Sequence, residues 1–347
     1  MKTVGLDLHK VNSQICELDE AGTVCREVRI PTSRKHLAKE FGERERMRIL
    51  LESSTESEWV ARYLEELGHE VIVADPGYAP MYPHRTGRVK TDRRDAQALA
   101  EACCTGSFRR AHRCSEANRR VRAQLLVREA LVRTRSRYIS LVRALLRGQG
   151  LRVRSGGAES FVKRVKEVEL APEVATVIEP LLEIMGDVTE RLKKMDEVLE
   201  TIAATDAVVR RLCTVPGVGP VTSISFKAVV DRIERFERAH RLESYLGLVP
   251  GERSSGEKRH RGHLSKRGNA RMRSLLIEAG WTLMRGNTSG SAGLSSWGCR
   301  IAARRGKQIA AVAVARRLTG ILYAMWRDQT DFDPQRVRVG KVALRAA

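Results

Sequence analysis

Four carboxylates in the N-terminal third of the chain could together bind a divalent cation. Asp7 lies inside the apolar stretch VGLDL, and Glu52 ends the apolar stretch ILLE. Asp92 and Asp95 stand three residues apart in a predicted helix and therefore share one face of it. Carboxylates that converge repel one another unless a cation neutralises them, and their hard oxygen ligands suit Mg²⁺. Two such ions can activate a nucleophile and stabilise a leaving oxygen, which is the chemistry of phosphoryl transfer.

Each carboxylate also has an ordinary interpretation. Asp95 could be an exposed helix residue, Asp92 a first-turn acid that the helix dipole stabilises, and Glu52 a solvated charge at a strand end. Asp7 is the hardest to interpret in this way, because a charge is normally excluded from the middle of a buried strand. The four together therefore indicate a metal site more strongly than any one alone.

A glycine- and serine-rich stretch is the second candidate for chemistry. It begins with GLVPGERSSG at residues 247–256 and continues through Gly262, Ser265, Lys266, Gly268 and Asn269. A serine beside a glycine in this positive field could attack phosphorus if its proton were removed and the oxyanion stabilised. The same serines could instead only donate hydrogen bonds to a bound phosphate, and the chemistry alone favours this second interpretation.

A third candidate is the turn LCTVPGVGP at residues 212–220, between two predicted helices. It matches a helix–hairpin–helix turn, in which backbone N–H groups near Gly217 and Gly219 can bind a DNA phosphate without reading the bases. A plain interhelical turn fits equally well. Aromatic residues make up only 5% of the chain, which argues against a platform that stacks on single-stranded bases.

The positive charge of the chain is concentrated in blocks. The formal net charge is +21, yet residues 1–108 carry 16 basic and 18 acidic side chains. Residues 109–154 carry 14 and 2, residues 252–273 carry 8 and 2, and residues 300–317 carry 6 and none. Such blocks indicate a polyanionic partner, although a solvated basic helix face is the simpler alternative. The predicted nucleic-acid contacts are Arg119, Arg120, Arg133, Arg137, Gly217, Gly219, Arg259 and Lys266.

The composition excludes several other classes of protein. Hydrophobic residues make up 42% of 347 residues, enough for packed cores in two or three domains. No run of about 18 apolar residues and no signal-peptide apolar region occurs, so no membrane association is expected. The seven cysteines form no CxxC pair, and we expect reduced thiols in the cytoplasm rather than a zinc site or disulfides.

The elements that must position the acids follow from periodicity. Residues 3–8, 13–18 and 23–30 are predicted strands, followed by a helix (33–45), a strand (48–52), a helix (57–67), a strand (70–74), a loop (75–90) and a helix that begins at Thr91. This is the element order of an RNase H-like domain, although other α/β orders remain possible. In that fold the strands of Asp7 and Glu52 are neighbours, so both carboxylates emerge at one edge of the sheet.

The rest of the chain is predicted to be mainly helical. Residues 116–148 and 172–205 show helical apolar spacing and indicate an antiparallel pair, either a coiled coil used for dimerisation or two core helices of a bundle. Residues 149–160 are the most linker-like part of this region. Residues from about 207 to 328 are predicted to be helical with one loop-rich insert. The predicted domains are 1–108, 109–205 and 206–330, followed by a tail at 331–347.

The motifs resemble those of the insertion-sequence-110 family transposases, the bridge-RNA-guided DNA recombinases. GLDLHK at 5–10 is similar to the first RuvC-like motif of that family, LLE at 50–52 to the second, and KTDRRDA at 90–96 to the third. VPGVG at 215–219, LGLVP at 246–250 and SSG at 254–256 resemble its C-terminal transposase domain, as do Gly262, Ser265, Lys266, Gly268 and Arg273. The resemblance covers about residues 1 to 325, with the motifs in the expected order.

The resemblance implies a RuvC-like (RNase H-like) catalytic domain, a coiled-coil segment and a C-terminal transposase domain. It implies that the metal-binding acids are Asp7, Glu52, Asp92 and Asp95, that the ion is Mg²⁺, and that Ser255, beside Ser254, is the nucleophile. It further implies strand exchange through a phosphoserine, with the acids and the serine on different protomers. The expected partners are donor and target DNA, a structured noncoding guide RNA and further copies of the chain in a dimer or tetramer. The expected location is the bacterial or archaeal cytoplasm, at the nucleoid.

Three functions therefore compete. The first is an RNA-guided recombinase that moves an insertion sequence through a serine–phosphate intermediate. The second is a RuvC-like, Mg²⁺-dependent structure-specific endonuclease that uses water and leaves no covalent adduct. The third is a nucleic-acid binder without catalysis, for which the acids would be dispensable.

Overall fold

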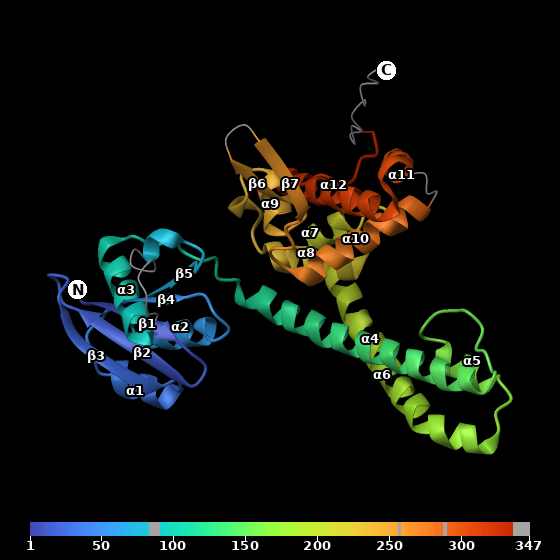
Figure 1. Cartoon of the computed structure of the whole chain (residues 1–347), viewed down its shortest axis with the longest axis horizontal. Helices are drawn as coiled ribbons and strands as arrows, with labels where there is room; N and C mark the ends of the chain where they lie inside the picture. The colour runs from blue at the N-terminus through green and yellow to red at the C-terminus, as the bar shows by residue number, and fades with distance from the viewer. Residues whose placement is uncertain (83–90, 256–257, 287–289, 336–347) are drawn as a thin grey trace. The chain divides into compact units, whose positions relative to one another are not determined.

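The computed structural model describes residues 1–82, 91–255, 258–286 and 290–335, and within these ranges it leaves the side chains of 253–255 and 258–261 undescribed. The chain forms two compact units, Met1–Cys114 and Ser115–Ala347 (Figure 1). All seven cysteines are free thiols. The predicted class, an α/β N-terminal part followed by a mainly helical remainder, is confirmed.

The first unit is built on a five-stranded sheet with the strand order β3-β2-β1-β4-β5. The strands are β1 (Thr3–Leu8), β2 (Asn12–Leu18), β3 (Val24–Pro31), β4 (Arg48–Glu52) and β5 (Glu70–Ala74). β1 pairs with β2, and β2 with β3, in antiparallel fashion, whereas β1 pairs with β4, and β4 with β5, in parallel. The helical elements are α1 (Arg34–Phe41), α2 (Ser57–Glu66), the short 3₁₀ helix η1 (Ala79–Met81) and α3 (Asp92–Thr105).

The predicted element order is present, with two corrections. The first helix, expected over 33–45, ends at Phe41, because the backbone of Gly42 closes the last turn on the carbonyl of Ala38. The expected loop after β5 contains η1, and its residues 83–90 lie outside the described ranges. The strand boundaries agree closely with the alternation of apolar residues.

Helices cover both faces of the sheet. Val4, Leu6 and Leu8 of β1 pack in one core together with α1 and α2. Because side chains alternate along a strand, Gly5 and Asp7 point to the opposite face, the face that α3 covers. Leu50 belongs to a core on the α3 face, so Glu52, two residues further along β4, points to that face as well. The alternation thus directs Asp7 and Glu52 to one side of the sheet.

Gly5 allows α3 to lie directly against β1. A Cβ atom at this position would come within 2.0 Å of the Ala96 carbonyl oxygen and 2.3 Å of the Ala100 nitrogen. The backbone of α3 therefore occupies the space that a side chain at position 5 would need. This close approach brings the first turn of α3, which carries Asp92 and Asp95, to the end of β1.

Two long antiparallel helices dominate the start of the second unit: α4 (Glu116–Gly148) and α6 (Pro172–Thr205), joined through the short α5 (Phe161–Lys166). Their antiparallel direction is visible in the pairing of Arg128 with Asp196 and of Arg135 with Thr189. Toward the tip of the pair, an apolar core joins α4, α5 and α6. Figure 1 shows both helices extending away from the remaining elements of this unit.

The predicted linker at 149–160 is not a free linker in the structure. The buried Arg164 side chain donates hydrogen bonds to the backbone carbonyls of Arg154, Gly157 and Ser160. A single guanidinium therefore fixes the path of the loop, which the glycine and serine content of the sequence could not indicate.

The remaining elements surround the largest core of the chain. They are α7 (Ala207–Leu212), α8 (Pro220–Val230), η2 (Ile233–Arg235), α9 (Ala239–Tyr245), β6 (Pro250–Ser255), β7 (Lys258–Leu264), α10 (Ala270–Arg285), α11 (Ala292–Arg305) and α12 (Lys307–Asp328). The expected loop-rich insert forms an antiparallel hairpin of β6 and β7 instead, with Pro250 opposite Leu264.

One helix among the described residues, α12, is long and apolar enough to cross a membrane by length and composition alone. Half of its most apolar window is buried inside the protein. Its residues Val314, Leu318 and Leu322 are fully buried in the core of the second unit. The apolarity of α12 is therefore accounted for by packing inside the protein.

Candidate functional site

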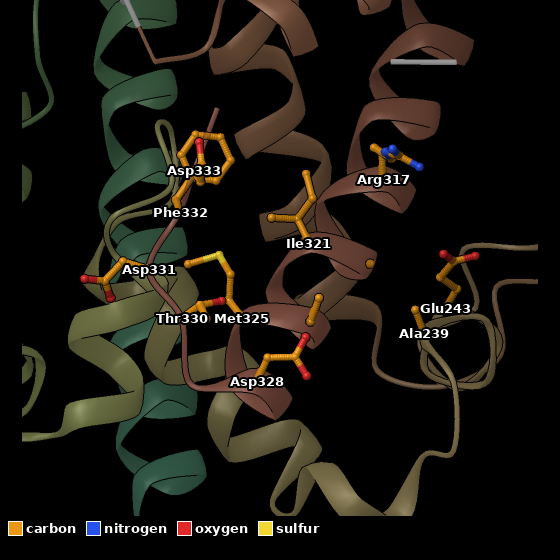
Figure 2. A pocket seen from close by; sticks show the side chains of 12 residues that line it. Ala239, Glu243, Arg317, Ile321, Met325, Asp328, Thr330, Asp331, Phe332 and Asp333 are labelled. Atoms are coloured by element: carbon orange, nitrogen blue, oxygen red, sulfur yellow. The ribbon is translucent and has the colours of Figure 1, made fainter. Parts of the chain in front are cut away.

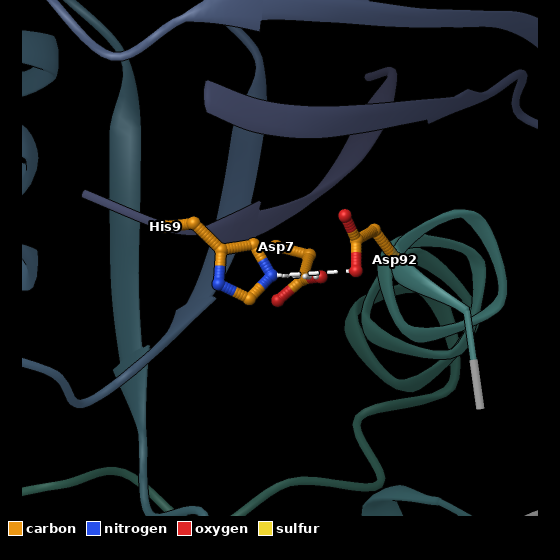
Figure 3. A group of neighbouring side chains, drawn as sticks. All are labelled: Asp7, His9 and Asp92. Carbon is orange, nitrogen blue, oxygen red and sulfur yellow. Dashed lines mark hydrogen bonds and ion pairs between the residues drawn. The ribbon is translucent and has the colours of Figure 1, made fainter. Parts of the chain in front are cut away.

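Asp7, His9 and Asp92 come together at the end of β1 (Figure 3). The His9 Nε2 atom lies 3.2 Å from Asp7 Oδ2 and 3.5 Å from Asp92 Oδ1. Asp7 is placed by β1, His9 by the chain that leaves β1, and Asp92 by the first turn of α3. That helix begins there because the Thr91 hydroxyl accepts a hydrogen bond from the Arg94 N–H.

The environment of Asp7 disfavours its charge. Burial raises the pKa of the Asp7 carboxyl above its ordinary value, and the charges of Asp95 and Asp92 raise it further, whereas His9 lowers it. The Asp7 side chain is 12% exposed, compared with 48% for Asp92. A buried carboxylate beside two others is stabilised by a nearby cation, because the cation offsets both the burial and the repulsion.

The other two predicted acids belong to the same face of the sheet. Asp95 is buried in the first turn of α3, and its charge acts on Asp7. The parallel register pairs Leu6 of β1 with Leu51 of β4, so Asp7 and Glu52 are the next positions along two neighbouring strands. Glu52 accepts a hydrogen bond from the hydroxyl of buried Tyr82. Asp7 and Asp92 thus meet directly, Asp95 acts on Asp7 through its charge, and register places Glu52 at the same strand ends.

This group of side chains fits a divalent cation. Within the described ranges, Asp7, His9 and Asp92 are the one set of three potential ligands whose donor atoms all lie within 4.8 Å of one another. Carboxylate oxygens suit Mg²⁺ or Mn²⁺, and an imidazole nitrogen is more typical of transition metals. The sequence-based prediction did not include His9 among the ligands. Its position two residues after Asp7, immediately beyond the strand, was the available signal.

The turn between α7 and α8 has an open helix N-terminus. Gly217 has φ +79°, a conformation that favours glycine, and an added Cβ there would lie 3.3 Å from the Ala279 carbonyl oxygen of α10. Gly219 precedes α8, and an added Cβ there would meet nothing within 4 Å. The α8 N-terminus, with Pro220 at its first position, has no side-chain cap. Pro220 carries no N–H group and the Ser223 N–H is bonded to the Gly219 carbonyl, so the N–H groups of this turn that could meet an anion are those of Val221 and Thr222.

The predicted serine nucleophile lies on the β6–β7 hairpin. The backbone of Ser255 pairs with Lys258 and that of Ser254 with Arg259, near the hairpin turn. The side chains of Ser255, Ser254 and Arg259 lie outside the described parts of the structure. Lys266 is exposed in the segment after β7 and has φ +53°.

The arginines of α4 divide into two groups. Arg122 donates to the carbonyls of Ala228 and Val229 at the end of α8, Arg128 pairs with Asp196, and buried Arg135 pairs with Glu159. These three hold the unit together. The predicted contacts differ: Arg120 and Arg133 are each 76% exposed and pair only within α4, Arg119 lies near Glu116, and Arg137 is exposed.

A pocket of about 380 Å³ lies between α9, α12 and residues 330–333 (Figure 2). Three of its four carboxylates form ion pairs, Glu243 with Arg316, Asp328 with Arg327, and Asp331 with Arg211, and the fourth, Asp333, accepts a hydrogen bond from the Gln335 N–H. No predicted site residue lines it. These contacts account for the acidic residues of the rim, so they do not form a second group of unpaired acids.

Two family models match the chain. A model described as "Transposase", of the DEDD type found in the IS110 group, matches residues 4–149. A model described as "Transposase IS116/IS110/IS902 family" matches residues 209–293. The first range contains Asp7, Glu52, Asp92 and Asp95, and the second contains the α7–α8 turn and the β6–β7 hairpin. A DEDD-type domain suggests the use of a divalent metal.

Curated relatives agree with the family models. "Transposase for insertion sequence element IS1111A" of Coxiella burnetii is 29% identical over 96% of this chain and 91% of its own length. "Transposase for insertion sequence element IS1328" of Yersinia enterocolitica is 26% identical over 95% and 98%. "Putative transposase y4qE" of Sinorhizobium fredii is 31% identical over 77% and 72%. With these matches and the acids at the strand ends, the chain belongs to the IS110 family of transposases, enzymes that act on the DNA of insertion sequences.

Proposed function

We propose that this transposase is an RNA-guided recombinase that cuts and rejoins DNA through a serine–phosphate intermediate. The observation that carries its metal-dependent step is the convergence of Asp7, His9 and Asp92 at the end of β1, with the charge of Asp95 acting on Asp7, and the guide RNA and the serine step rest on the resemblance to the family. The strand order β3-β2-β1-β4-β5, with helices on both faces, supports an RNase H-like fold for the first unit. In such a fold the ends of β1 and β4 form the catalytic edge.

The acids would hold Mg²⁺, and the hairpin serine would act as the nucleophile. Asp7, Glu52, Asp92 and Asp95 supply carboxylate oxygens, which suit this ion. When bound, the ion would polarise the scissile phosphate and lower the pKa of a coordinated hydroxyl. The ring nitrogen Nε2 of His9 is hydrogen-bonded to Asp7 at 3.2 Å and lies 3.5 Å from Asp92.

The covalent step conserves the number of phosphoester bonds and needs no external energy source. The Ser255 hydroxyl loses its proton to a base, its oxygen forms a bond to phosphorus, and the bond from phosphorus to one deoxyribose oxygen breaks. The freed oxygen takes up a proton. Attack by a different DNA hydroxyl on the phosphoserine reverses the step and joins the strands. The phosphodiester is conserved throughout, so no nucleotide triphosphate is needed.

The partners follow from the charge distribution and from the resemblance to the family. Exposed arginines of α4, together with the α8 N-terminus, would contact the phosphates of RNA and DNA, and base pairing to a structured noncoding RNA would select donor and target sites. The acids of one protomer would act with the serine of another in a dimer or tetramer, with α4 and α6 as a coiled coil. The protein would work in the cytoplasm, at the nucleoid.

The test is a recombination assay with purified protein, RNA transcribed from the noncoding flank of the element, donor and target plasmids, and Mg²⁺. The protein should join donor to target, and denaturing gels should reveal a protein–DNA adduct. Asp7→Asn should abolish both, and Ser255→Ala should abolish the adduct. Ser254→Ala serves as the matched control for the adjacent hydroxyl. Full recombination by both serine variants would contradict the serine mechanism, and cleavage without any adduct would favour a water-using endonuclease.

A further inference from the structure

Two segments cross at the base of the β6–β7 hairpin with their backbones in direct contact. A Cβ at Gly247, just before β6, would lie 2.0 Å from the Arg267 carbonyl oxygen. A Cβ at Gly268, just after β7, would lie 1.9 Å from the Tyr245 carbonyl oxygen. Both glycines also have positive φ, +70° and +85°. Only glycine at both positions therefore allows this crossing.

The crossing leaves several backbone carbonyls gathered in one place, and Arg273 binds them. Its Nη1 atom donates to the carbonyls of Leu246 at 3.1 Å, Arg267 at 3.0 Å and Gly268 at 3.2 Å. Leu246 precedes the hairpin, and Arg267 and Gly268 follow it. A single guanidinium on the first turns of α10 thus ties the incoming chain to the outgoing chain.

The hairpin depends on this base for its orientation. β6 and β7 pair only with each other in the described part of the structure, and a two-stranded ribbon has little stability of its own. At its base the hairpin ends with the pairing of Pro250 and Leu264 and with a hydrogen bond of 2.9 Å from the Ser265 N–H to the Val249 carbonyl. Ser254 and Ser255 lie at the other end of β6. A small rotation of the hairpin about its base therefore moves the backbone of these two residues further than it moves the residues at the base.

We propose that Arg273 is a positioning residue for the nucleophilic serine: its guanidinium holds the base of the β6–β7 hairpin and thereby fixes where the backbone of Ser255 lies. This inference rests on the proposed serine mechanism. Arginine suits the role because its rigid, planar guanidinium carries Nη1 one bond further from the backbone than the ammonium of a lysine extends, so a lysine at this position would fall short of the three carbonyls.

The experiment compares Arg273→Lys, Arg273→Ala and the control Arg271→Lys in the full-length protein, assembled with the same RNA and DNA as above. Arg271 lies two residues away on α10 and pairs with Glu129 at 2.6 Å, a contact that lysine can retain. The rate of adduct formation is measured in single turnover at saturating DNA, together with DNA affinity and melting temperature. Misplacement by about 1 Å can cost on the order of a hundredfold in rate.

We expect substitution of Arg273 to lower the rate of adduct formation without a matching loss of DNA affinity. Arg273→Lys should slow adduct formation by at least roughly tenfold, while its DNA affinity and melting temperature stay close to those of the unmodified protein and of Arg271→Lys. Added guanidinium ion should restore part of the rate of Arg273→Ala, and methylammonium at the same concentration should not.

Two outcomes would overturn the inference. The first is an unchanged rate in Arg273→Lys, and the second is an equal loss of rate, affinity and melting temperature without guanidinium rescue, which would indicate a general folding role. The variants Ser255→Ala and Ser254→Ala distinguish a failure of the proposed function from a failure of the inference about Arg273. If both retain full recombination, the serine mechanism itself is wrong, whatever Arg273 does.

Discussion

At the scale of single residues, Asp7 shows how a site can conflict with the stability of its own fold. Its carboxylate lies at a half-buried strand end, beside Asp92 and Asp95, and each of these conditions disfavours the charge. A residue whose charge opposes folding of the metal-free protein is typical of functional sites, where stability is given up for activity. His9 offsets part of the conflict, and a cation would offset the remainder.

Asp7→Asn should therefore stabilise the metal-free protein while removing its response to metal. Relief of burial and repulsion should raise the free energy of unfolding by roughly 0.5–2 kcal/mol. Thermal unfolding in EDTA and with added Mg²⁺ or Mn²⁺ measures both effects. Metal should raise the melting temperature of the unmodified protein and of Glu45→Gln, an exposed carboxylate of the same unit. An Asp7→Asn protein that metal still stabilises equally would show that the ion binds elsewhere.

At the scale of elements, the acidic site depends on how closely α3 approaches β1. The helix carries two of the acids and the strand carries a third, and Gly5 is the residue that lets their backbones touch. Any side chain at this position must push the helix away from the sheet. The geometry of the acids is thus coupled to a residue that has no chemistry of its own.

Gly5→Ala should lower the free energy of unfolding by about 1–3 kcal/mol, the usual cost of overpacking. It should also weaken metal binding, because Asp92 and Asp95 move with α3. Urea unfolding and metal titration of the same sample measure the two losses. Gly148→Ala at the end of α4 is the control, since an added Cβ there meets nothing within 4 Å. A Gly5→Ala protein with unchanged metal affinity would contradict the coupling.

The junction of α6 and α7 makes a separate, pH-dependent contribution. Asp206 accepts hydrogen bonds from the N–H groups of Val208 and Val209 and pairs with Lys227. Burial raises the pKa of Asp206, but the hydrogen bonds from Lys227 and the backbone lower it more, so the net pKa is below its ordinary value of 3.8. The stability that this carboxylate contributes is present above that value and is lost as the pH falls through the folded-state pKa.

Asp206→Asn should keep the helix cap but lose this dependence on pH. Near neutral pH the variant should be less stable by on the order of 1 kcal/mol, and the difference should shrink once the pH falls below the ordinary pKa of an aspartate and vanish below the lowered pKa of folded Asp206. Urea unfolding followed between pH 3 and pH 7 tests the sign. A difference that grows toward acid pH would mean that the charge of Asp206 opposes folding.

At the scale of the whole molecule, the basic side chains of a chain with a net charge of +21 fall into two groups. Part of it is internal: Arg122, Arg128, Arg135, Arg164 and Arg273 bind carbonyls or carboxylates within the second unit. Another part is exposed along α4 and available to phosphates. Only the exposed part should contribute to the salt dependence of nucleic-acid binding.

Arg120→Gln combined with Arg133→Gln should lower the slope of log affinity against log salt by about 2, close to one unit for each lost phosphate contact. Both side chains pair only within α4, so little stability should be lost. Fluorescence anisotropy with duplex DNA over a salt series measures the slope. The control replaces exposed Lys193 and Lys194 of α6 by glutamine, with the same change in charge. Equal slopes for the two double variants would indicate that DNA responds to the overall positive charge of the protein and makes no particular contact with α4.

The features of this protein that depend on local physics could be predicted from its amino acids alone. Strand alternation, helix periodicity and the cap at Thr91 fixed the elements of the first unit closely, and the position of Asp7 inside an apolar strand already indicated an unusual carboxylate. Such signals act over a few residues, so no tertiary contact is needed to interpret them.

The contacts between distant side chains emerge from the folded structure and not from local sequence patterns. Folding brought His9 to Asp7 and Asp92, separated the internal arginines of α4 from the exposed ones, and turned the expected linker into a loop held by Arg164. It also formed a hairpin where a loop was expected, above a crossing that Arg273 closes. The physical reason is that these contacts join residues far apart in the chain, and neither periodicity nor composition carries information about distant partners.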